Sequence, residues 1–238
     1  MTSNFIIPSP REFCAGFIHL LYPELCVACD RDIPLKNACF CLKCRQKITP
    51  FDLSSPGDNE FTDRFWGRLP IQYGVAGFHL SRKNPIHRAI HKLKYHNKPE
   101  IAEILGRELG QKLKLTDIQQ MDGIIPVPLH PAKERARGYN QSLFFAKGLA
   151  ESMQIPVYSK ALERKKFTAT QTKKNRMERF ENVGEVFAIR QADLLEGKHL
   201  LLVDDVMTTG ATLEMCGQQL LQVQGASLSL ATMAIADL

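Results

Sequence analysis

The run from His199 to Met215 (HLLLVDDVMTTGATLEM) brings together residue types that could bind a phosphorylated sugar. Leu200 to Val203 predict a strand buried on both faces, with Asp204 and Asp205 at its carboxyl end. The turn after it offers hydroxyl and backbone N–H groups ahead of a helix, which favours a phosphate. Adjacent carboxylates can hold ribose hydroxyls or hydrated Mg²⁺. An ordinary strand–turn–helix of a parallel sheet is the alternative.

Four cysteines near the N-terminus have the spacing of a structural zinc site. Cys26 and Cys29 form one CxxC turn, and Cys41 and Cys44 form a second one shortly after it. Each turn can point two sulfurs at one centre, so four thiolates could hold Zn²⁺ tetrahedrally and leave no position open for catalysis. Cys39 could substitute for a ligand, although Cys41 preserves the CxxC geometry. A redox or disulfide role for one CxxC is the alternative.

Length and composition indicate a soluble globular protein. The 238 residues can bury one large core, or one core and a small satellite. No apolar run approaches the ~20 residues needed to span a bilayer, which predicts no membrane insertion. Residues 13–23 predict a short amphipathic helix instead of a signal peptide, because no small-residue cleavage site follows. We therefore expect a cytoplasmic protein.

Positive charge is concentrated in two blocks. Residues 71–120 carry nine basic and four acidic side chains, and residues 160–181 carry eight and three. A solvated basic surface is one interpretation. The other is attraction of a polyanion, either a pyrophosphorylated sugar or nucleic acid. The second block is also weakly periodic, so it is either a disordered loop or a mobile cover for an anionic ligand.

The elements that must position these residues alternate between strands and helices. This order predicts a doubly wound, mainly parallel sheet whose ligand site lies beyond the carboxyl ends of the strands. We expect three parts: a helix and zinc ribbon (1–50), a linker (51–70) docked through Phe61, Phe65 and Trp66, and the main domain (71–238). Within the main domain we expect strands at 71–80, 123–129, 186–189 and 227–235, and helices at 85–95, 101–113, 138–153 and 211–223.

The order of motifs along the chain resembles the ComF family of competence proteins. The CxxC pair is followed by Leu93-Lys94-Tyr95, then Pro126-Val-Pro-Leu129, then Arg137-Gly-Tyr-Asn-Gln141, then the basic loop and the acid–threonine motif. The acid–threonine motif is similar to the phosphoribosyl-pyrophosphate (PRPP) motif of type I phosphoribosyltransferases. Lys174 departs from the family pattern, where a leucine is expected. The resemblance implies the type I phosphoribosyltransferase fold behind a four-cysteine zinc ribbon.

The resemblance also implies roles for individual residues. Asp204 and Asp205 would be the catalytic acids that hold the ribose hydroxyls, directly or through Mg²⁺. The residues implied to bind PRPP are Thr208, Thr209, Gly210, Ala211 and Thr212 at the 5′-phosphate, Val127, Pro128, Leu129 and Arg137 at the pyrophosphate, and Asn140, Gln171 and Arg179 around them. Arg137 and Asn140 could instead serve as helix caps.

Two functions of different classes follow from the resemblance. The first is a PRPP-binding phosphoribosyltransferase with an unknown acceptor, involved in DNA uptake during natural transformation. The second is a protein without catalysis that binds single-stranded DNA or proteins of the uptake machinery through the same fold. The charge distribution favours neither, because both ligands are polyanions. The paired acids and the phosphate turn favour retained PRPP binding.

Overall fold

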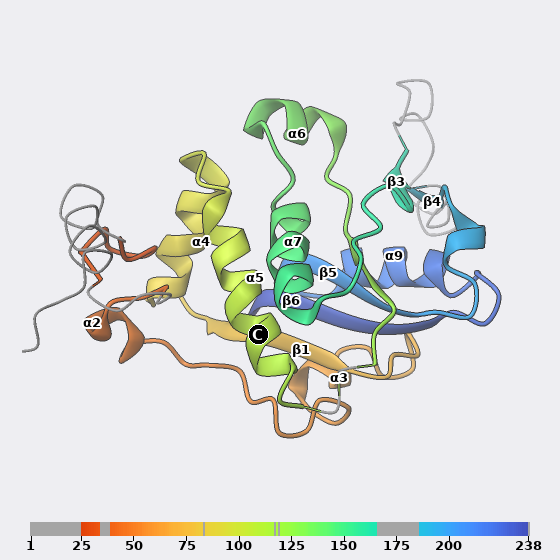
Figure 1. The fold of residues 1–238 in the computed structure, drawn as a ribbon, viewed down its shortest axis with the longest axis horizontal. Helices are drawn as coiled ribbons and strands as arrows, with labels where there is room; N and C mark the ends of the chain where they lie inside the picture. Colours follow the sequence, from red (N-terminus) through yellow and green to blue (C-terminus); the bar gives the residue numbers. More distant parts are fainter. Residues whose placement is uncertain are drawn as a thin grey trace, which may run out of the picture.

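A four-stranded parallel sheet forms the centre of the molecule (Figure 1). The computed structural model describes residues 25–33, 39–82, 84–116, 118, 120–165 and 186–237. The strands are β1 (Gly74–Leu80), β2 (Gly123–Pro126), β5 (His199–Met207) and β6 (Ser227–Ala236), in the order β1-β6-β5-β2. All pairs are parallel, so the carboxyl ends meet at one edge. The predicted parallel sheet is confirmed.

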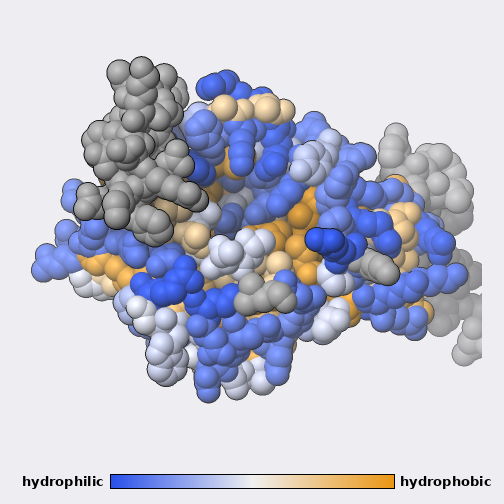
Figure 2. Space-filling view, turned by 180° about the vertical axis from the view of Figure 1, so that it is seen from behind, coloured by the Kyte–Doolittle hydropathy of each residue, from blue (hydrophilic) through white to orange (hydrophobic). Residues whose placement is uncertain are grey.

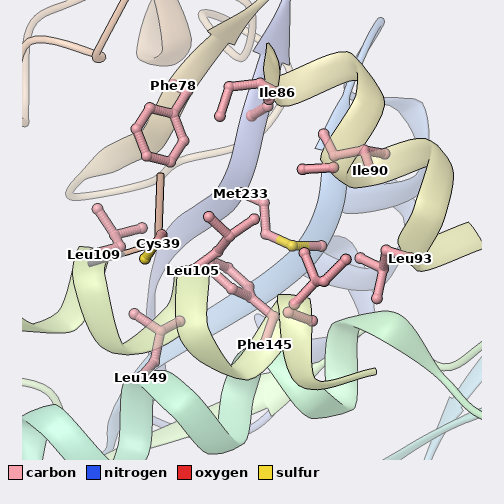
Figure 3. Packing of buried hydrophobic residues seen from close by; sticks show 14 of the residues in the cluster. Cys39, Phe78, Ile86, Ile90, Leu93, Leu105, Leu109, Phe145, Leu149 and Met233 are labelled. Carbon is pink, nitrogen blue, oxygen red and sulfur yellow. The ribbon is translucent and has the colours of Figure 1, made fainter. Parts of the chain in front are cut away.

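Alternate residues of β5 contribute to two separate cores. Leu201 and Val203 pack with α4 (Pro85–Tyr95), α5 (Glu100–Leu113) and α7 (Gln141–Met153), whose buried side chains converge in Figure 3. Leu200 and Leu202 pack on the other face with α9 (Ala211–Leu220). The uninterrupted apolar run of this strand therefore reflects burial on both faces, as predicted.

Two glycines allow α5 and α7 to cross closely. A Cβ at Gly106 would lie 2.4 Å from the Phe145 carbonyl oxygen, and one at Gly148 would lie 2.1 Å from the Glu103 carbonyl oxygen. Neither contact is possible for a larger residue without moving a helix. The pair thus forms a rigid layer on one face of the sheet, and the start of α7 is held above β5.

The chain between residues 51 and 70, which we expect to be a linker, includes regular structure. It contains α3 (Glu60–Asp63), with Asn59 as a capping-box residue. Phe61 and Phe65 are buried in the α9-side core, as predicted, but Trp66 is 86% exposed, so its predicted docking is wrong. The tight turn after α3 points the indole outward. We call residues 59–69 the α3 segment.

Smaller differences from the predicted elements concern boundaries. The predicted helix from Gly138 is wrong at its start, because α6 (Pro131–Arg137) ends at Gly138 in a left-handed conformation (φ 85°) and α7 begins at Gln141. The predicted strand at 186–189 is β4 (Phe187–Ile189), and its partner β3 (Leu162–Arg164) was not expected. Two short elements, α2 (Leu42–Arg45) and η4 (Ala192–Leu194), complete the fold.

The face of the molecule that Figure 2 shows is mostly hydrophilic, and the hydrophobic side chains visible there gather mainly near its centre. No helix within the described residues has the length and apolar character needed to cross a membrane.

Candidate functional site

Asp204 is held from two directions near the carboxyl end of β5. Its Oδ1 accepts a hydrogen bond of 2.8 Å from the Ser142 hydroxyl on α7 and another of 2.8 Å from the Asp205 backbone N–H. Burial, and after it the neighbouring Asp205, raise the pKa of Asp204 to about 7, while the hydrogen bond from Ser142 opposes the shift. This carboxyl therefore changes protonation state near neutral pH.

Asp205 has a different set of partners. Its Oδ1 accepts a hydrogen bond of 2.7 Å from the Val206 backbone N–H, and its Oδ2 lies 2.8 Å from the Lys94 ammonium at the end of α4. The Leu93-Lys94-Tyr95 motif at the end of α4 is thus brought to the acid pair on β5. The sequence alone gave no reason to pair Lys94 with an acid.

The predicted phosphate turn follows β5 directly. Gly210 is the N-cap of α9 and adopts a left-handed conformation (φ 78°); having no side chain, it cannot cap the helix, and no side-chain cap is made at this position among the described residues. Thr209 Oγ1 accepts only a long bond of 3.4 Å from the Ala211 N–H. First-turn N–H groups without strong partners can bind an anion, which the helix dipole also favours. Thr208–Thr212 therefore have the geometry of a phosphate loop.

The α3 segment supports the back of this loop. Arg64 donates 2.5 Å and 2.8 Å hydrogen bonds to the carbonyl oxygens of Thr208 and Ala236. Arg68 donates to the Thr209 carbonyl at 3.5 Å and pairs with Glu214 on α9. A Cβ on Gly210 would lie only 2.8 Å from Cζ of the Phe65 ring, so this ring leaves no room for a side chain at residue 210. These contacts were missed, and the only signal in the sequence was the Arg-Phe-Trp-Gly-Arg run at residues 64–68.

The predicted pyrophosphate residues are brought to the same edge of the sheet. The Val127 N–H continues the pairing of β2 with β5 through a 2.9 Å bond to the Val203 carbonyl, and Pro128 and Leu129 follow. Asn140 donates 2.9 Å to the Val127 carbonyl and accepts from the Ser142 N–H, so it caps α7 and ties this turn to it. The cap alternative for Asn140 is confirmed.

Of the three remaining residues predicted to bind PRPP, the structure describes only Arg137. Arg137 is the last residue of α6 and is partly exposed. Gln171 and Arg179 lie outside the described residues. Gln141, beside the cap, is 2% exposed, and its amide nitrogen has no hydrogen-bond partner among the described residues.

The four predicted metal ligands form one cluster. The sulfur atoms of Cys26, Cys29, Cys41 and Cys44 all lie within 4.8 Å of one another. The pKa of Cys41 is lowered to about 7, chiefly by a hydrogen bond from the Cys44 backbone N–H, whereas burial raises the pKa of Cys44 to about 12. Four convergent sulfurs with one acidic thiol fit a tetrahedral zinc ion, which would be held structurally.

Cys39 is directed away from this cluster. Its Sγ lies 3.8 Å from the Ile104 carbonyl on α5, and Figure 3 shows it among core residues that include Phe78 and Leu109. Burial raises the pKa of its thiol far above the usual range, with Glu108 contributing. The cysteine region also packs into the core with α4 and α5, through contacts such as Phe40 on Phe78 (ring centroids 5.8 Å apart).

This chain is similar to known proteins in a matched domain family, in sequence and in structure. Residues 140–237 match the family described as phosphoribosyl transferase domain. The chain is 34% identical over 142 residues to "DNA utilization protein YhgH" of Escherichia coli O157:H7, which covers 58% of this chain and 62% of that protein. It is 26% identical over 205 residues to "Competence protein F" of Haemophilus influenzae, covering 84% and 85%. An adenine phosphoribosyltransferase from Saccharomyces cerevisiae overlays with a TM-score of 0.38 at 16% identity, over 63% of this chain and 72% of that one.

The parallel sheet, the acid pair and the domain match define the class: the chain has a type I phosphoribosyltransferase-like fold, with a four-cysteine cluster before it. The similar proteins also include "Competence protein ComFC" of Bacillus subtilis, which is 31% identical over 99 residues and covers 42% of this chain and 38% of that protein. The chain spans 62% of the length of the Escherichia coli relative.

Proposed function

We propose that this protein binds PRPP with Mg²⁺ and acts in DNA uptake during natural transformation in the cytoplasm. The observation that carries the proposal is the joint position of Asp204, Asp205 and the Thr208–Thr212 loop at the end of β5. A fold used only as a scaffold would not require paired acids beside helix N–H groups without strong partners. The names of the relatives support the role in DNA uptake.

Different residues of the site would bind different parts of PRPP. The N–H and hydroxyl groups of Thr208–Thr212 would bind the 5′-phosphate, and Asp204 and Asp205 would bind the ribose hydroxyls. The turn at Val127–Leu129 and Arg137 would meet the pyrophosphate. When bound, Mg²⁺ would neutralise charge on the pyrophosphate.

Transfer of the phosphoribosyl group would break the bond between ribose C1 and pyrophosphate, through a transition state with positive charge on the sugar. Within that reaction, Asp204 and Asp205 would fix the sugar, and the phosphate loop would anchor its far end. Because the α3 segment binds the loop through backbone carbonyls, the loop's N–H groups stay available for the ligand.

The test is calorimetric titration of the zinc-loaded protein with PRPP, with and without Mg²⁺. The control is the double variant Asp204→Asn, Asp205→Asn, in which the hydrogen-bond acceptors remain but the charges are lost. We expect Mg²⁺-dependent binding that the variant loses. A folded wild-type protein that binds no PRPP would overturn the proposal.

A second candidate, binding of single-stranded DNA, is favoured by the exposed face of α4. The stretch from Ser81 to Pro99 contains six Lys or Arg residues, three His residues and no acid. At its end, the His91 ring lies 4.8 Å from the Tyr95 ring and 5.6 Å from the His96 ring, and Tyr95 is 71% exposed. Exposed rings beside cations are the platform on which unpaired bases stack.

The second candidate is tested by fluorescence anisotropy with a labelled thymidine oligonucleotide. We expect His91→Ala, Tyr95→Ala to weaken binding by roughly tenfold, since stacking contributes about 1–3 kcal/mol per base. Trp66→Ala, which removes an exposed aromatic on the α3 segment, is the matched control. Affinity that is unchanged in the α4 variant, or that does not fall with added salt, would exclude this surface.

A further inference from the structure

Two carboxylate oxygens of the acid pair, Asp204 Oδ2 and Asp205 Oδ2, have no backbone or hydroxyl donor among the contacts above, and Lys94 covers the second of them. Asp204 Oδ1 is taken by Ser142 and by a backbone N–H, and Asp205 Oδ1 is taken by the Val206 N–H. Asp205 Oδ2 instead meets the Lys94 ammonium at 2.8 Å. A divalent cation approaching Asp205 Oδ2 would therefore meet the Lys94 ammonium.

The residue at this position is suited to displacement. Both side chains are partly accessible, with 27% of Lys94 and 18% of Asp205 exposed. The backbone of Lys94 is fixed, because Ile90 and Leu93 of α4 are buried in the core. A lysine carries a compact charge on a flexible stem with four carbons, so the ammonium can move while the helix stays in place.

We propose that Lys94 is a displaceable counter-ion that makes cation binding at the acid pair depend on the sugar diphosphate. The inference rests on the proposed function and adds an order of binding to it. In the free protein, Lys94 partly neutralises the two adjacent carboxylates. When the metal–diphosphate complex enters, the cation takes the place of the ammonium, and the ammonium moves to the diphosphate.

Electrostatics explains why the two ligands would be coupled. A free cation that displaces Lys94 leaves an ammonium group beside a metal ion, and the two like charges repel. A metal–diphosphate complex has net negative charge, so the displaced ammonium gains a partner. The same side chain thus opposes the free cation and favours the complex, which gives positive coupling between metal and diphosphate.

The variant Lys94→Met tests this proposal because it keeps the length and packing of the side chain without the charge. Free Mn²⁺ is titrated first and observed by electron paramagnetic resonance; PRPP is then titrated in the presence of Mg²⁺. We expect Lys94→Met to bind free Mn²⁺ at least about fivefold more tightly and the Mg²⁺–PRPP complex at least about fivefold more weakly.

Lys92→Met is the matched control. Lys92 lies on the same helix, but its ammonium pairs with Asp30 of the cysteine region at 2.6 Å. We expect it to change neither affinity. Free Mn²⁺ binding that is unchanged or weaker in Lys94→Met would overturn the counter-ion proposal, and so would tighter binding of Mg²⁺–PRPP, which would make Lys94 a simple inhibitor.

The two proposals fail in different ways. Wild-type protein that binds no PRPP overturns the proposed function. The Mn²⁺ titration uses the metal alone, so it still decides whether Lys94 opposes a cation at Asp205. Circular dichroism of all three proteins confirms that a change in affinity is not a loss of fold.

Discussion

The cysteine cluster and the acid pair are built in opposite ways. All four sulfurs come from residues 26–44, and two short turns bring them within 4.8 Å of one another. The acids lie side by side in one strand, but their partners Lys94 and Ser142 come from α4 and α7, and the loop after them is held by Arg64. The first site is local in sequence, whereas the second exists only when the whole sheet is assembled.

The largest expected effect comes from removing a cluster cysteine. Cys44→Ser should abolish zinc binding, because serine is a poor ligand and the remaining three thiolates leave the site open. The cysteine region shares a core with α4 and α5, so the loss should lower the free energy of unfolding of the main domain by roughly 3 kcal/mol or more. Metal analysis and thermal unfolding measure the two effects.

Cys39→Ala sharpens this prediction as a matched control. The variant should keep full zinc content and lose only packing, about 1–2 kcal/mol. Zinc loss in Cys39→Ala would show that the ligand set is wrong. Unchanged thermal stability in zinc-free Cys44→Ser would show instead that the cluster does not support the main domain.

The contrast between the two sites also explains what could be predicted from sequence. CxxC spacing, and the run from Leu200 to Thr212, encode their own local geometry, so the cysteine cluster and the turn between β5 and α9 could be predicted from the sequence. Lys94, Arg64 and Ser142 carry no such pattern. Their roles depend on which helix covers which end of β5, and that is decided by packing such as the Gly106–Gly148 crossing.

Boundaries that depend on one residue's conformation were also missed. Gly138 ends α6 in a left-handed conformation, and Asn140 caps α7 two residues later, so the predicted helix begins only at Gln141 and a separate helix precedes it. Tryptophan is a residue type that is often buried, and only the turn after α3 decides that Trp66 points outward.

The second prediction concerns the partly buried Asp204. Asp204 has a pKa of about 7 in the folded protein, above its usual value of 3.8. The folded state therefore binds this proton more tightly than the unfolded state, and stability falls as pH rises from about 4 to about 7. Asp204→Asn should relieve this cost and stabilise the protein by about 2–4 kcal/mol at about pH 8, and by much less at about pH 5.

Chemical denaturation at both pH values, in the absence of PRPP, measures this effect. Asp193→Asn, at an exposed position on η4, is the control and should change stability little. The same Asp204→Asn protein should lose PRPP binding, so function and stability would change in opposite directions. A variant that is less stable than wild type at both pH values would contradict the raised pKa.

The third prediction tests the support of the phosphate loop. Arg64→Met should lower PRPP affinity by about fivefold, because the Thr208 and Ala236 carbonyls lose two charge-assisted hydrogen bonds and the loop is held less firmly. The cost in unfolding free energy should be about 1–2 kcal/mol. Calorimetry and denaturation give both values. An unchanged affinity would show that β5 and α9 alone fix the loop.

The smallest expected effect is that of Arg68→Met. Arg68 pairs with Glu214 at the surface, with 41% and 20% of the two side chains exposed, and its bond to the Thr209 carbonyl is long at 3.5 Å. Such a pair contributes less than about 1 kcal/mol, and salt screens it. We expect PRPP affinity within about twofold of wild type, since the main loop contact belongs to Arg64. A larger loss than in Arg64→Met would reverse this order and place Arg68 in direct contact with the ligand, because its weak structural bonds could not account for the effect.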